Sequence, residues 1–428
     1  MQSINDKNPI KKLLILNQKD PKELDFNLIL RTGLIILAGG QGSRLGFDGP
    51  KGAFKLEKIG KSIFDVYFGK IKKIEKEYGD YFEKSKKKLS VFVMCSEFTL
   101  EDTKKILKDL TKNLDLKYTD TYIFAQDSLK VKDIHYNNIY KNSTDFQTAP
   151  NGNGGLIFCI HKLNLVEMFK EKEINVINII TVDNILNNFF DLKVIKKFYD
   201  VSSTKDSYKV KLLEEVDIIS KGVEKHEGEN AGVFCVKDKR LVVVEYNDYK
   251  REKESSTENK ESEIKESGNK ESGNKEIIKE SENGGEKNKS KNKESEIKES
   301  KNKKSGNKKS EIKGEKKNIA NICHHYMNIN FLYAVFKMPE HSLLLKKHVA
   351  FKKIDYYDEK TQKIVKPEEI NGIKYEYFIF DIFDYSNEER NLVYEVNRSE
   401  EFSPLKNAEG KDSIKTCQED YLALLKKN

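Results

Sequence analysis

The sequence predicts an α/β fold in which a parallel sheet is covered by helices on both faces. Four segments, at 33–38, 89–95, 122–125 and 174–182, are continuous apolar runs, which is typical of strands buried on both sides. Amphipathic helical patterns separate these runs, and this alternation indicates parallel strands joined by helices. The chain has 428 residues, more than one hydrophobic core usually serves, so we expect two or three lobes.

The first half of the chain supplies the clearest elements. The run at 33–38, GLIILA, is bounded by glycine and is expected at the centre of the sheet. A helix is predicted after it from apolar residues that share one helical face, namely Ile63, Phe64, Tyr67, Ile71 and Ile74. The strand at 89–95 is followed by Thr99 and Asp102, which resemble a capping box at the start of a second amphipathic helix.

Three later segments complete the predicted elements. The glycine-rich segment 150–155 is expected to open a helix. The apolar segments 376–384 (EYFIFDIFD) and 391–396 (NLVYEV) are predicted to be mainly sheet, in an order that the residues do not define.

The segment 251–317 interrupts this pattern. It contains 20 basic and 16 acidic residues, five isoleucines as its only apolar residues, and the heptapeptide ESEIKES at both 261–267 and 294–300. Such a composition buries too little apolar surface to offset the entropy lost on ordering, so we predict a disordered, low-complexity insertion.

Charge and hydropathy exclude several classes of protein. The net charge is +8, and the insertion carries half of it, so the remaining surface is too weakly basic to indicate nucleic-acid binding. No apolar run approaches the roughly 18 residues of a membrane span, and the first residues lack the apolar core of a signal peptide. We therefore expect a cytoplasmic protein that binds neither nucleic acid nor membrane. The five cysteines lack CxxC spacing and are expected to be reduced, mostly buried thiols.

In parallel α/β sheets, ligands bind at the carboxyl ends of the strands. The first apolar run leads into Gly39 and Gly40, the third into Gln126, and the fourth into Asp183. These residues are the first candidates for a binding site. An acidic side chain at the end of a buried strand needs a compensating partner, so a bound cation or a helix N-terminus is expected at Asp183.

The segment 37–51 carries the strongest chemical signal. It reads LAGGQGSRLGFDGPK, in which glycines let backbone N–H groups approach a polyphosphate while Arg44 and Lys51 supply two cations. The pattern differs from both the Walker motif and the GxGxxG dinucleotide motif. We predict a phosphate-binding loop of another kind.

This segment resembles the signature of the eukaryotic UDP-sugar pyrophosphorylases, specifically the UDP-N-acetylglucosamine pyrophosphorylase family. Further matching motifs follow in the same order along the chain: MCSEFT (94–99), APNGNGGL (149–156), TVDNIL (181–186), GVFCVKDKRLVVVEY (232–246), NICHHYMNINFL (321–332), NGIKYEYFIFDIF (371–383) and FSPLKNA (402–408). The insertion has no counterpart in this pattern.

The resemblance implies a Rossmann-like nucleotidyltransferase core, with a mixed, mostly parallel sheet and a sugar-binding sub-lobe. The catalytic domain would comprise 31–250 and 318–428, after a short N-terminal segment at 1–30. The implied reaction joins UTP to N-acetylglucosamine 1-phosphate and releases pyrophosphate, with Mg²⁺ as cofactor. No protein partner can be inferred.

The resemblance also assigns roles to individual residues. Catalytic roles fall to Arg44 and Lys51, which would hold pyrophosphate and the α-phosphate, and to Lys406. Nucleotide contacts are implied for Leu37, Ala38, Gly39, Gly40, Gln126, Gly152, Asp183 and Lys374. Within this set, Gln126 and Gly152 would read the uracil edge, and Asp183 would face Mg²⁺.

For the sugar, the resemblance implies contacts from residues on several motifs: Asn153, Gly232, Glu245, Tyr246, Asn321, Phe378 and Phe380. The two phenylalanines would wall the acetyl group, although alternating aromatics in a strand are also common in protein cores. The usual family motif NIxNH reads NICHH here, with His324 at the second asparagine position, and the alternative alignment uses 318–321. We expect His324 and His325 to be packing or hydrogen-bonding residues.

Two alternatives to this function remain. The chain could act on another sugar phosphate, such as glucose or N-acetylgalactosamine 1-phosphate, or it could be a catalytically silent homologue. Compared with the family, the chain resembles a reduced form with short termini. Arg44, Lys51, Asp183 and Lys406 are all retained, which favours an active enzyme.

Overall fold

The computed structural model describes residues 13–16, 19–245, 318–338 and 345–427. The segment predicted to be a disordered insertion, 251–317, lies outside the described residues, as does Tyr246.

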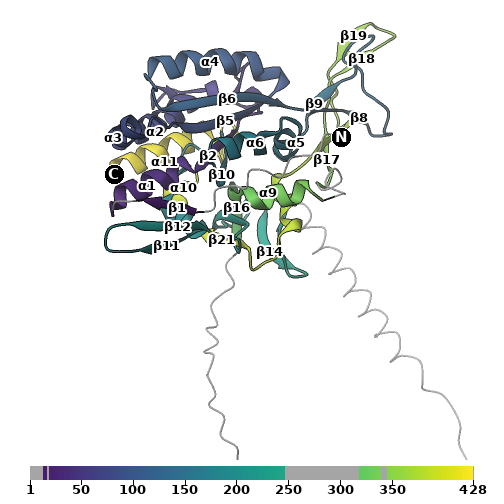
Figure 1. Ribbon diagram of the computed structural model, residues 1–428. Helices are drawn as coiled ribbons and strands as arrows, with labels where there is room; N and C mark the ends of the chain where they lie inside the picture. The colour runs from purple at the N-terminus through teal and green to yellow at the C-terminus, as the bar shows by residue number, and fades with distance from the viewer. Residues whose placement is uncertain (1–12, 17–18, 246–317, 339–344, 428) are drawn as a thin grey trace, which may run out of the picture. The chain divides into compact units, whose positions relative to one another are not determined.

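A nine-stranded mixed sheet forms the centre of the unit made of 1–245 and 318–428 (Figure 1). Its parallel part has the order β10-β2-β5-β6. The bounds are β2 (Thr32–Leu37), β5 (Leu89–Ser96), β6 (Thr119–Gln126) and β10 (Val176–Thr181). These are the four apolar runs, so their prediction as strands of one parallel sheet is confirmed. Burial on both faces is confirmed for β2, β5 and β10, whereas β6, at the edge of the sheet, is half-buried along most of its length.

The other part of the sheet is mostly antiparallel. The long strand β16 (Ile319–Asn328) pairs with β10 and β14 (Val233–Lys237) and also with β13 (Ile218–Glu224). The remaining strands are β15 (Arg240–Val244), antiparallel to β14, and β21 (Asn391–Glu395), parallel to β13. The prediction of a strand at 391–396 is therefore confirmed.

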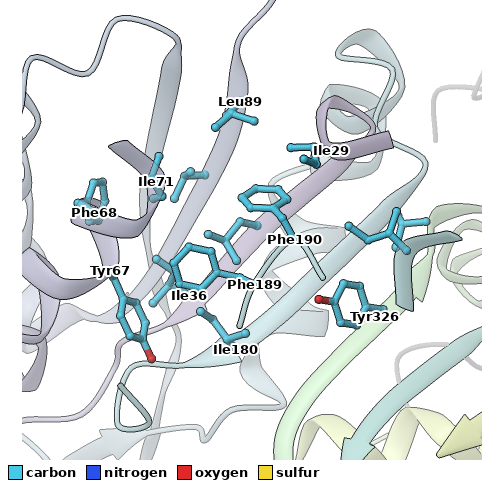
Figure 2. Close-up of a cluster of buried hydrophobic side chains, with 14 of the residues drawn as sticks. Ile29, Ile36, Tyr67, Phe68, Ile71, Leu89, Ile180, Phe189, Phe190 and Tyr326 are labelled. Carbon is cyan, nitrogen blue, oxygen red and sulfur yellow. The ribbon is translucent and has the colours of Figure 1, made fainter. Parts of the chain in front are cut away.

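Helices cover both faces of the sheet. One face carries α1 (Pro21–Leu30), α2 (Ile63–Glu77), α3 (Gly79–Ser85), α4 (Leu100–Asn113), α7 (Leu192–Ile195) and α11 (Ile414–Lys427). The other carries α5 (Gly155–Lys162), α6 (Leu165–Glu171) and α9 (Ile329–Phe336). Alternate strand residues serve the two cores, since Ile36 packs in the first and Ile35 in the second. Figure 2 shows the first core, with Ile36 and Ile180 of the sheet beside Phe68 and Phe189.

Smaller sheets surround the central one. Three strands, β1 (Leu13–Leu16), β12 (Tyr208–Leu212) and β11 (Tyr199–Ser203), form one of them. Another consists of β17 (His348–Lys352), β20 (Gly372–Glu376) and β8 (Lys132–Asp133). Strand pairs are formed by β3 (Lys55–Leu56) with β4 (Lys61–Ser62), β7 (Ser128–Lys130) with β9 (Thr148–Pro150), and β18 (Tyr356–Asp358) with β19 (Lys363–Val365).

The predicted capping box at Thr99 is wrong. Helix α4 begins at Leu100 without a side-chain cap, and the Thr99 hydroxyl lies 3.0 Å from the Ser96 hydroxyl. A 3₁₀ turn at Glu97–Thr99 precedes the helix, and Thr99 hydrogen-bonds back into this turn. The structure has a capping box instead at α2, where Ser62 Oγ accepts from Asp65 N and Asp65 Oδ2 accepts from Ser62 N.

The prediction of sheet at 376–384 is also wrong for most of this segment. Strand β20 ends at Glu376, and a 3₁₀ helix occupies Ile379–Tyr385. Its apolar side chains repeat every three residues, as Ile379 with Ile382 and Phe380 with Phe383, and all four are buried in the second core. The apolar residues at 379–383 therefore follow the three-residue period of a 3₁₀ helix, not the two-residue alternation of a strand.

An irregularity in β16 shapes the edge of the functional site. Opposite β13, Lys221 pairs with His324 and Gly222 pairs with Asn321, so two residues of β16 bulge out between them. One of the two, Cys323, has a φ of 54°, in the left-handed region that residues with side chains rarely adopt. Bulges of this kind are common beside active sites because they redirect side chains.

Among the described residues, no helix combines the length and the apolar character needed to cross a bilayer. All five cysteines are reduced, with Cys95, Cys159 and Cys417 buried and Cys235 and Cys323 partly buried. These thiols are in the state predicted from their spacing.

Candidate functional site

A cavity of about 650 Å³ lies at the carboxyl ends of the parallel strands, where the sequence predicted a ligand site. Residues at the ends of β2, β5, β6 and β10 line it together with residues of β9 and β20. It brings together eleven of the predicted site residues: Leu37, Gly39, Gly40, Arg44, Lys51, Gln126, Gly152, Asn153, Asp183, Lys374 and Phe378.

The loop after β2 forms the floor of the cavity. Ala38 is buried, and its N–H donates to Met94 O at 2.7 Å, so the chain stays beside β5 before it turns. A Cβ on Gly39 would lie 2.7 Å from Gln126 Nε2, so only glycine fits there without displacing that amide. The loop then folds back on itself, with Lys51 N donating to Gly40 O at 3.0 Å. This hydrogen bond places Lys51, at the end of the loop, beside the cavity.

Lys51 and Asp183 form the charged centre of the site. Lys51 Nζ lies 3.8 Å from Asp183 Oδ2, and both side chains are largely buried. Burial lowers the pKa of Lys51, the Asp183 carboxylate opposes this shift, and the positive charges of Arg44 and Lys406 add to it. Three cations therefore gather around one carboxylate, which favours binding of a polyanion.

A backbone contact of the preceding residue, Leu405, places Lys406 next to this charged centre. Leu405 N donates to Asp183 O at 2.8 Å, and Pro404 forms a β-bridge with Asn184. Lys406 pairs with Asp412 at 3.4 Å, and about a third of its side chain is exposed. It does not line the 650 Å³ cavity itself, but it lies next to the charged centre.

Gln126 supplies an unused hydrogen-bond acceptor. The residue is only 5% exposed at the end of β6, and its Oε1 has no hydrogen-bond partner among the described residues. Buried polar atoms in proteins are nearly always paired, so an unpaired acceptor that lines a cavity indicates a ligand donor. Nearby, Gly152 has a φ of 88°, and a Cβ there would lie 2.5 Å from Tyr377 O. Glycine is thus required where the chain passes the β20 segment.

Residues of β20 also line the cavity. Lys374 pairs with Glu376 at 3.1 Å, and both line the cavity. Asn153 joins this segment to the core, since its Oδ1 accepts from Ile379 N at 2.9 Å. Its Nδ2 donates to Cys323 Sγ at 3.4 Å. Asn153 therefore connects the cavity with the bulge in β16.

The remaining predicted sugar residues lie beyond this bulge. Asn321 N donates to Gly232 O at 2.8 Å, and a Cβ on Gly232 would lie 2.9 Å from Glu245 Oε1. Asn321 also accepts a hydrogen bond from Cys323 N at 2.8 Å. These three residues form a second group that does not line the 650 Å³ cavity and that Cys323 joins to Asn153. Burial raises the pKa of the Cys323 thiol to about 12, and the charges of Asp183 and Glu245 act in the same direction.

The two predicted aromatic contacts occupy different environments. Phe378 lines the cavity, whereas Phe380 is 7% exposed and belongs to the second core. Their rings stack with centroids 5.1 Å apart, so Phe380 supports Phe378. His348 packs against both rings and lies 2.8 Å from Asp381 Oδ2.

Within the described part of the chain, no three His, Cys, Asp or Glu side chains converge on a point that could hold a metal ion. His324 and His325 are fully buried, and His325 Nδ1 lies 2.8 Å from Ser220 Oγ. Burial lowers the pKa of both, to about 3 for His325. They are neutral packing residues, as predicted. A cation in the cavity would have the Asp183 carboxylate as its protein ligand, and Mg²⁺ bound through phosphates commonly uses only one or two carboxylates.

Several cavity residues were missed in the sequence: Ser96, Phe98, Lys141, Gln147, Thr148 and Thr181. Ser96 and Phe98 belong to the MCSEFT motif, which therefore held a signal that was not used. Lys141 lies in a segment without a clear pattern, and nothing in its neighbourhood marked it out.

Comparisons with known proteins agree with this geometry. The family described as UTP–glucose-1-phosphate uridylyltransferase matches residues 1–269. A protein from Schizosaccharomyces pombe is 29% identical over 91% of this chain and 70% of its own length, and one from Encephalitozoon cuniculi is 30% identical over 90% and 82%. Both are named "Probable UDP-N-acetylglucosamine pyrophosphorylase". A crystal structure from Entamoeba histolytica, provisionally described with the same activity, superimposes with a TM-score of 0.66 at 26% identity, covering 94% of this chain and 83% of that one.

Proposed function

The chain belongs to the UTP–glucose-1-phosphate uridylyltransferase family and is a nucleotidyltransferase, and we propose that it joins UTP to N-acetylglucosamine 1-phosphate. The products would be UDP-N-acetylglucosamine and pyrophosphate. The names of its relatives support this choice of sugar. The observation that carries the proposal is the single cavity in which an unpaired Gln126 acceptor faces the same space as Arg44, Lys51 and Asp183.

Uracil binding follows from the hydrogen-bonding groups at one end of the cavity. Uracil presents one N–H donor between two carbonyl acceptors. Gln126 Oε1 is free to accept from that N–H, and the glutamine amide supplies a donor as well. Cytosine presents an acceptor at the ring position where uracil has its N–H, so it would face Gln126 Oε1 with a lone pair. We therefore propose that Gln126 selects UTP over CTP.

The transfer itself needs no protein nucleophile. A phosphate oxygen of the sugar phosphate attacks the α-phosphorus of UTP in line, a new P–O bond forms, and the bond to pyrophosphate breaks. Both reactants are anionic, so catalysis depends on positioning and on neutralising charge. Arg44 would hold the departing pyrophosphate, and Lys51 the α-phosphate, because both line the cavity next to the carboxyl end of β10. Lys374 and Lys406 would neutralise the remaining phosphate charge.

Asp183 fits a role in holding Mg²⁺. Its carboxylate lines the cavity among cations that would also contact phosphate, and it is a hard oxygen ligand of the kind that Mg²⁺ prefers. Bound Mg²⁺ would neutralise charge on the triphosphate. Lys51 compensates Asp183 in the structure described here.

The sugar would lie between the cavity and the group on β14, β15 and β16. Phe378 offers an apolar wall to an acetyl methyl group, and Asn321 and Glu245 offer polar groups to sugar hydroxyls. Gly232, Glu245 and Asn321 are connected to the cavity through Cys323 and Asn153.

A coupled pyrophosphate-release assay tests the proposal. UTP would be offered with N-acetylglucosamine, N-acetylgalactosamine or glucose 1-phosphate, with Mg²⁺ or with EDTA. We expect the highest kcat/KM with N-acetylglucosamine 1-phosphate and loss of activity in EDTA. A tenfold preference for either other sugar would overturn the substrate assignment. Absence of pyrophosphate release with all three would favour the silent homologue, and full activity in EDTA would overturn the role of Mg²⁺.

A further inference from the structure

The residue after Asp183 is almost completely buried and makes an unusual set of contacts. Asn184 is 1% exposed. Its Oδ1 accepts from Ser403 N at 2.9 Å and from Leu186 N at 3.3 Å. Its Nδ2 donates to Glu401 O at 2.7 Å and to Asn187 Oδ1 at 2.9 Å. Two of these partners lie in the turn after β10, and two lie more than two hundred residues later.

This arrangement uses the full capacity of a carboxamide. The group has two N–H donors and an oxygen with two acceptor positions, and all four are engaged. Alanine could make none of these bonds, and aspartate could only accept. The side chain of Asn184 is therefore specifically suited to joining the turn after β10 to the segment 401–403.

The segment that Asn184 holds leads directly to Lys406. Beyond Ser403, Leu405 N donates to Asp183 O, so the two segments of the chain remain side by side up to the charged centre. The Lys406 side chain is about one-third exposed and is paired with Asp412 at 3.4 Å. The Lys406 N–H also donates to Asp412 O at 2.7 Å, so both of these contacts of the lysine are with Asp412. Its distance from Asp183 depends on how the 401–405 segment is held.

Other contacts attach this segment to the rest of the fold. Glu401 Oε2 lies 2.6 Å from Nζ of the fully buried Lys221 on β13. Ser403 Oγ donates to Asp420 Oδ2 at 2.7 Å on α11. Neither contact involves the turn that carries Asp183. Loss of the Asn184 amide would leave the backbone bond from Leu405 N to Asp183 O as the remaining direct hydrogen bond between the segment and this turn, so the segment could shift further relative to Asp183 than it does with Asn184 in place.

We propose that Asn184 is a positioning residue for nucleotidyl transfer, whose side-chain amide sets the location of Lys406 relative to Asp183. The proposal rests on the function proposed above for Lys406. Small displacements of a charged group in a preorganised site reduce turnover more than they reduce binding. Asn184 therefore acts on kcat without touching the substrates.

A double-mutant cycle tests this coupling. Turnover would be measured for Asn184→Ala, Lys406→Ala and the double variant, together with UTP affinity by calorimetry. We expect Asn184→Ala to lower kcat by about 10- to 100-fold, with UTP affinity changed less than about threefold. In the Lys406→Ala background, the same substitution should lower kcat by less than about threefold, because the group that it positions is already absent.

Asn328 provides a matched control. It is 2% exposed, its Nδ2 donates to Leu213 O and Val216 O, and its Oδ1 accepts from Asn330 N. It faces Val176, at the amino end of β10 and opposite the cavity. Asn328→Ala should lower the urea midpoint of unfolding as Asn184→Ala does, while kcat of the folded enzyme stays within about twofold in both backgrounds.

Each outcome decides the proposal. Normal kcat in folded Asn184→Ala, or an equal loss in both backgrounds, would overturn the positioning role while leaving the proposed function intact. Normal kcat in Lys406→Ala would overturn the role of Lys406 and this proposal with it. If Asn184→Ala does not fold, Asn184→Asp passes through the same cycle, since it keeps the acceptor for Ser403 N but loses both donors.

Discussion

The two halves of the proposed site, one assigned to the nucleotide and one to the sugar, are built differently. The nucleotide half, comprising the loop after β2 with Gln126 and Asp183, stands at the carboxyl ends of strands in the parallel part of the sheet and lines one cavity. The sugar half, comprising Gly232, Glu245 and Asn321, stands on antiparallel strands and connects to that cavity through Cys323 and Asn153. The first half is organised around charge, and the second around side-chain contacts at a strand bulge.

This difference shows what each half depends on. Parallel strands joined by helices bring their carboxyl ends to one edge of the sheet, so the short loops that follow them lie close together without any additional long-range contact. The sugar half depends on the register of β16, which shifts between its pairing with Lys221 and its pairing with Gly222. Substitutions in the two halves should therefore fail in different ways.

The largest effect is expected in the nucleotide half. Lys51→Ala and Asp183→Asn should each lower kcat by about 10² or more, because each removes one preorganised charge at the reacting phosphates. The free energy of unfolding should also fall, by about 1 to 3 kcal/mol, because both side chains are largely buried and each substitution leaves the other charge without its partner. Pyrophosphate release and urea unfolding measure the two quantities.

Lys105→Ala is the control for this prediction, since Lys105 is an exposed residue of α4 outside the cavity. It should retain wild-type kcat. If Lys51→Ala and Asp183→Asn also retain kcat within threefold, the nucleotide half is not organised around charge as described.

An intermediate effect is expected where the halves meet. Phe378→Leu should reduce kcat/KM for N-acetylglucosamine 1-phosphate relative to glucose 1-phosphate by roughly 1 kcal/mol or more, because the acetyl group loses its aromatic wall. Phe380→Leu should instead lower the free energy of unfolding by about 1 kcal/mol and affect both sugars equally, since Phe380 is a core residue. Equal behaviour of the two variants would show that the two rings share one role.

The smallest effect on activity at neutral pH concerns the acid response of β16, the strand that carries Asn321. Burial lowers the pKa of His325 to about 3, whereas an exposed histidine in the unfolded chain titrates near 6.5. Between these values the unfolded state binds a proton that the folded state does not, so the free energy of unfolding falls as pH falls from 6.5 toward 3, by about 1.4 kcal/mol per pH unit. Above pH 6.5 this group contributes no pH dependence.

Urea unfolding at pH 7, 6 and 5 measures this response. His325→Gln should flatten the decline in stability below pH 6.5, while His226→Gln, at an exposed loop position, should leave it unchanged. An unaltered slope in His325→Gln would show that the buried ring does not control the acid response.

The sequence was most informative where structure is local. The strands at 33–38, 89–95, 122–125 and 174–182 were predictable because each is one apolar run, and the residues after them reach a common edge. The 3₁₀ helix at 379–385 was not predictable, since an apolar segment of seven residues is too short to distinguish a three-residue period from strand alternation. The order of β13, β14 and β16 was not predictable either, because it depends on pairing between distant segments.

Site residues follow the same division. Arg44, Lys51 and Asp183 could be nominated from their place after apolar runs, together with the resemblance of their motifs. The role of Asn184 could not, because its partners at 401 and 403 are known only from the folded chain. Lys141 enters the cavity from a segment whose local sequence has no regular pattern.

The hydrogen bond between Leu405 N and Asp183 O also affects how the enzyme folds during its synthesis on the ribosome. These residues are 222 positions apart, so at about 5 to 20 residues per second the nascent chain presents Asp183 roughly 10 to 45 s before its partner is synthesised. During this interval of translation, the segment at the end of β10 lacks its contacts with residues 404 and 405. Activity can therefore begin only after Leu405 and Lys406 have been synthesised, and a chaperone that shields this edge would act within that interval.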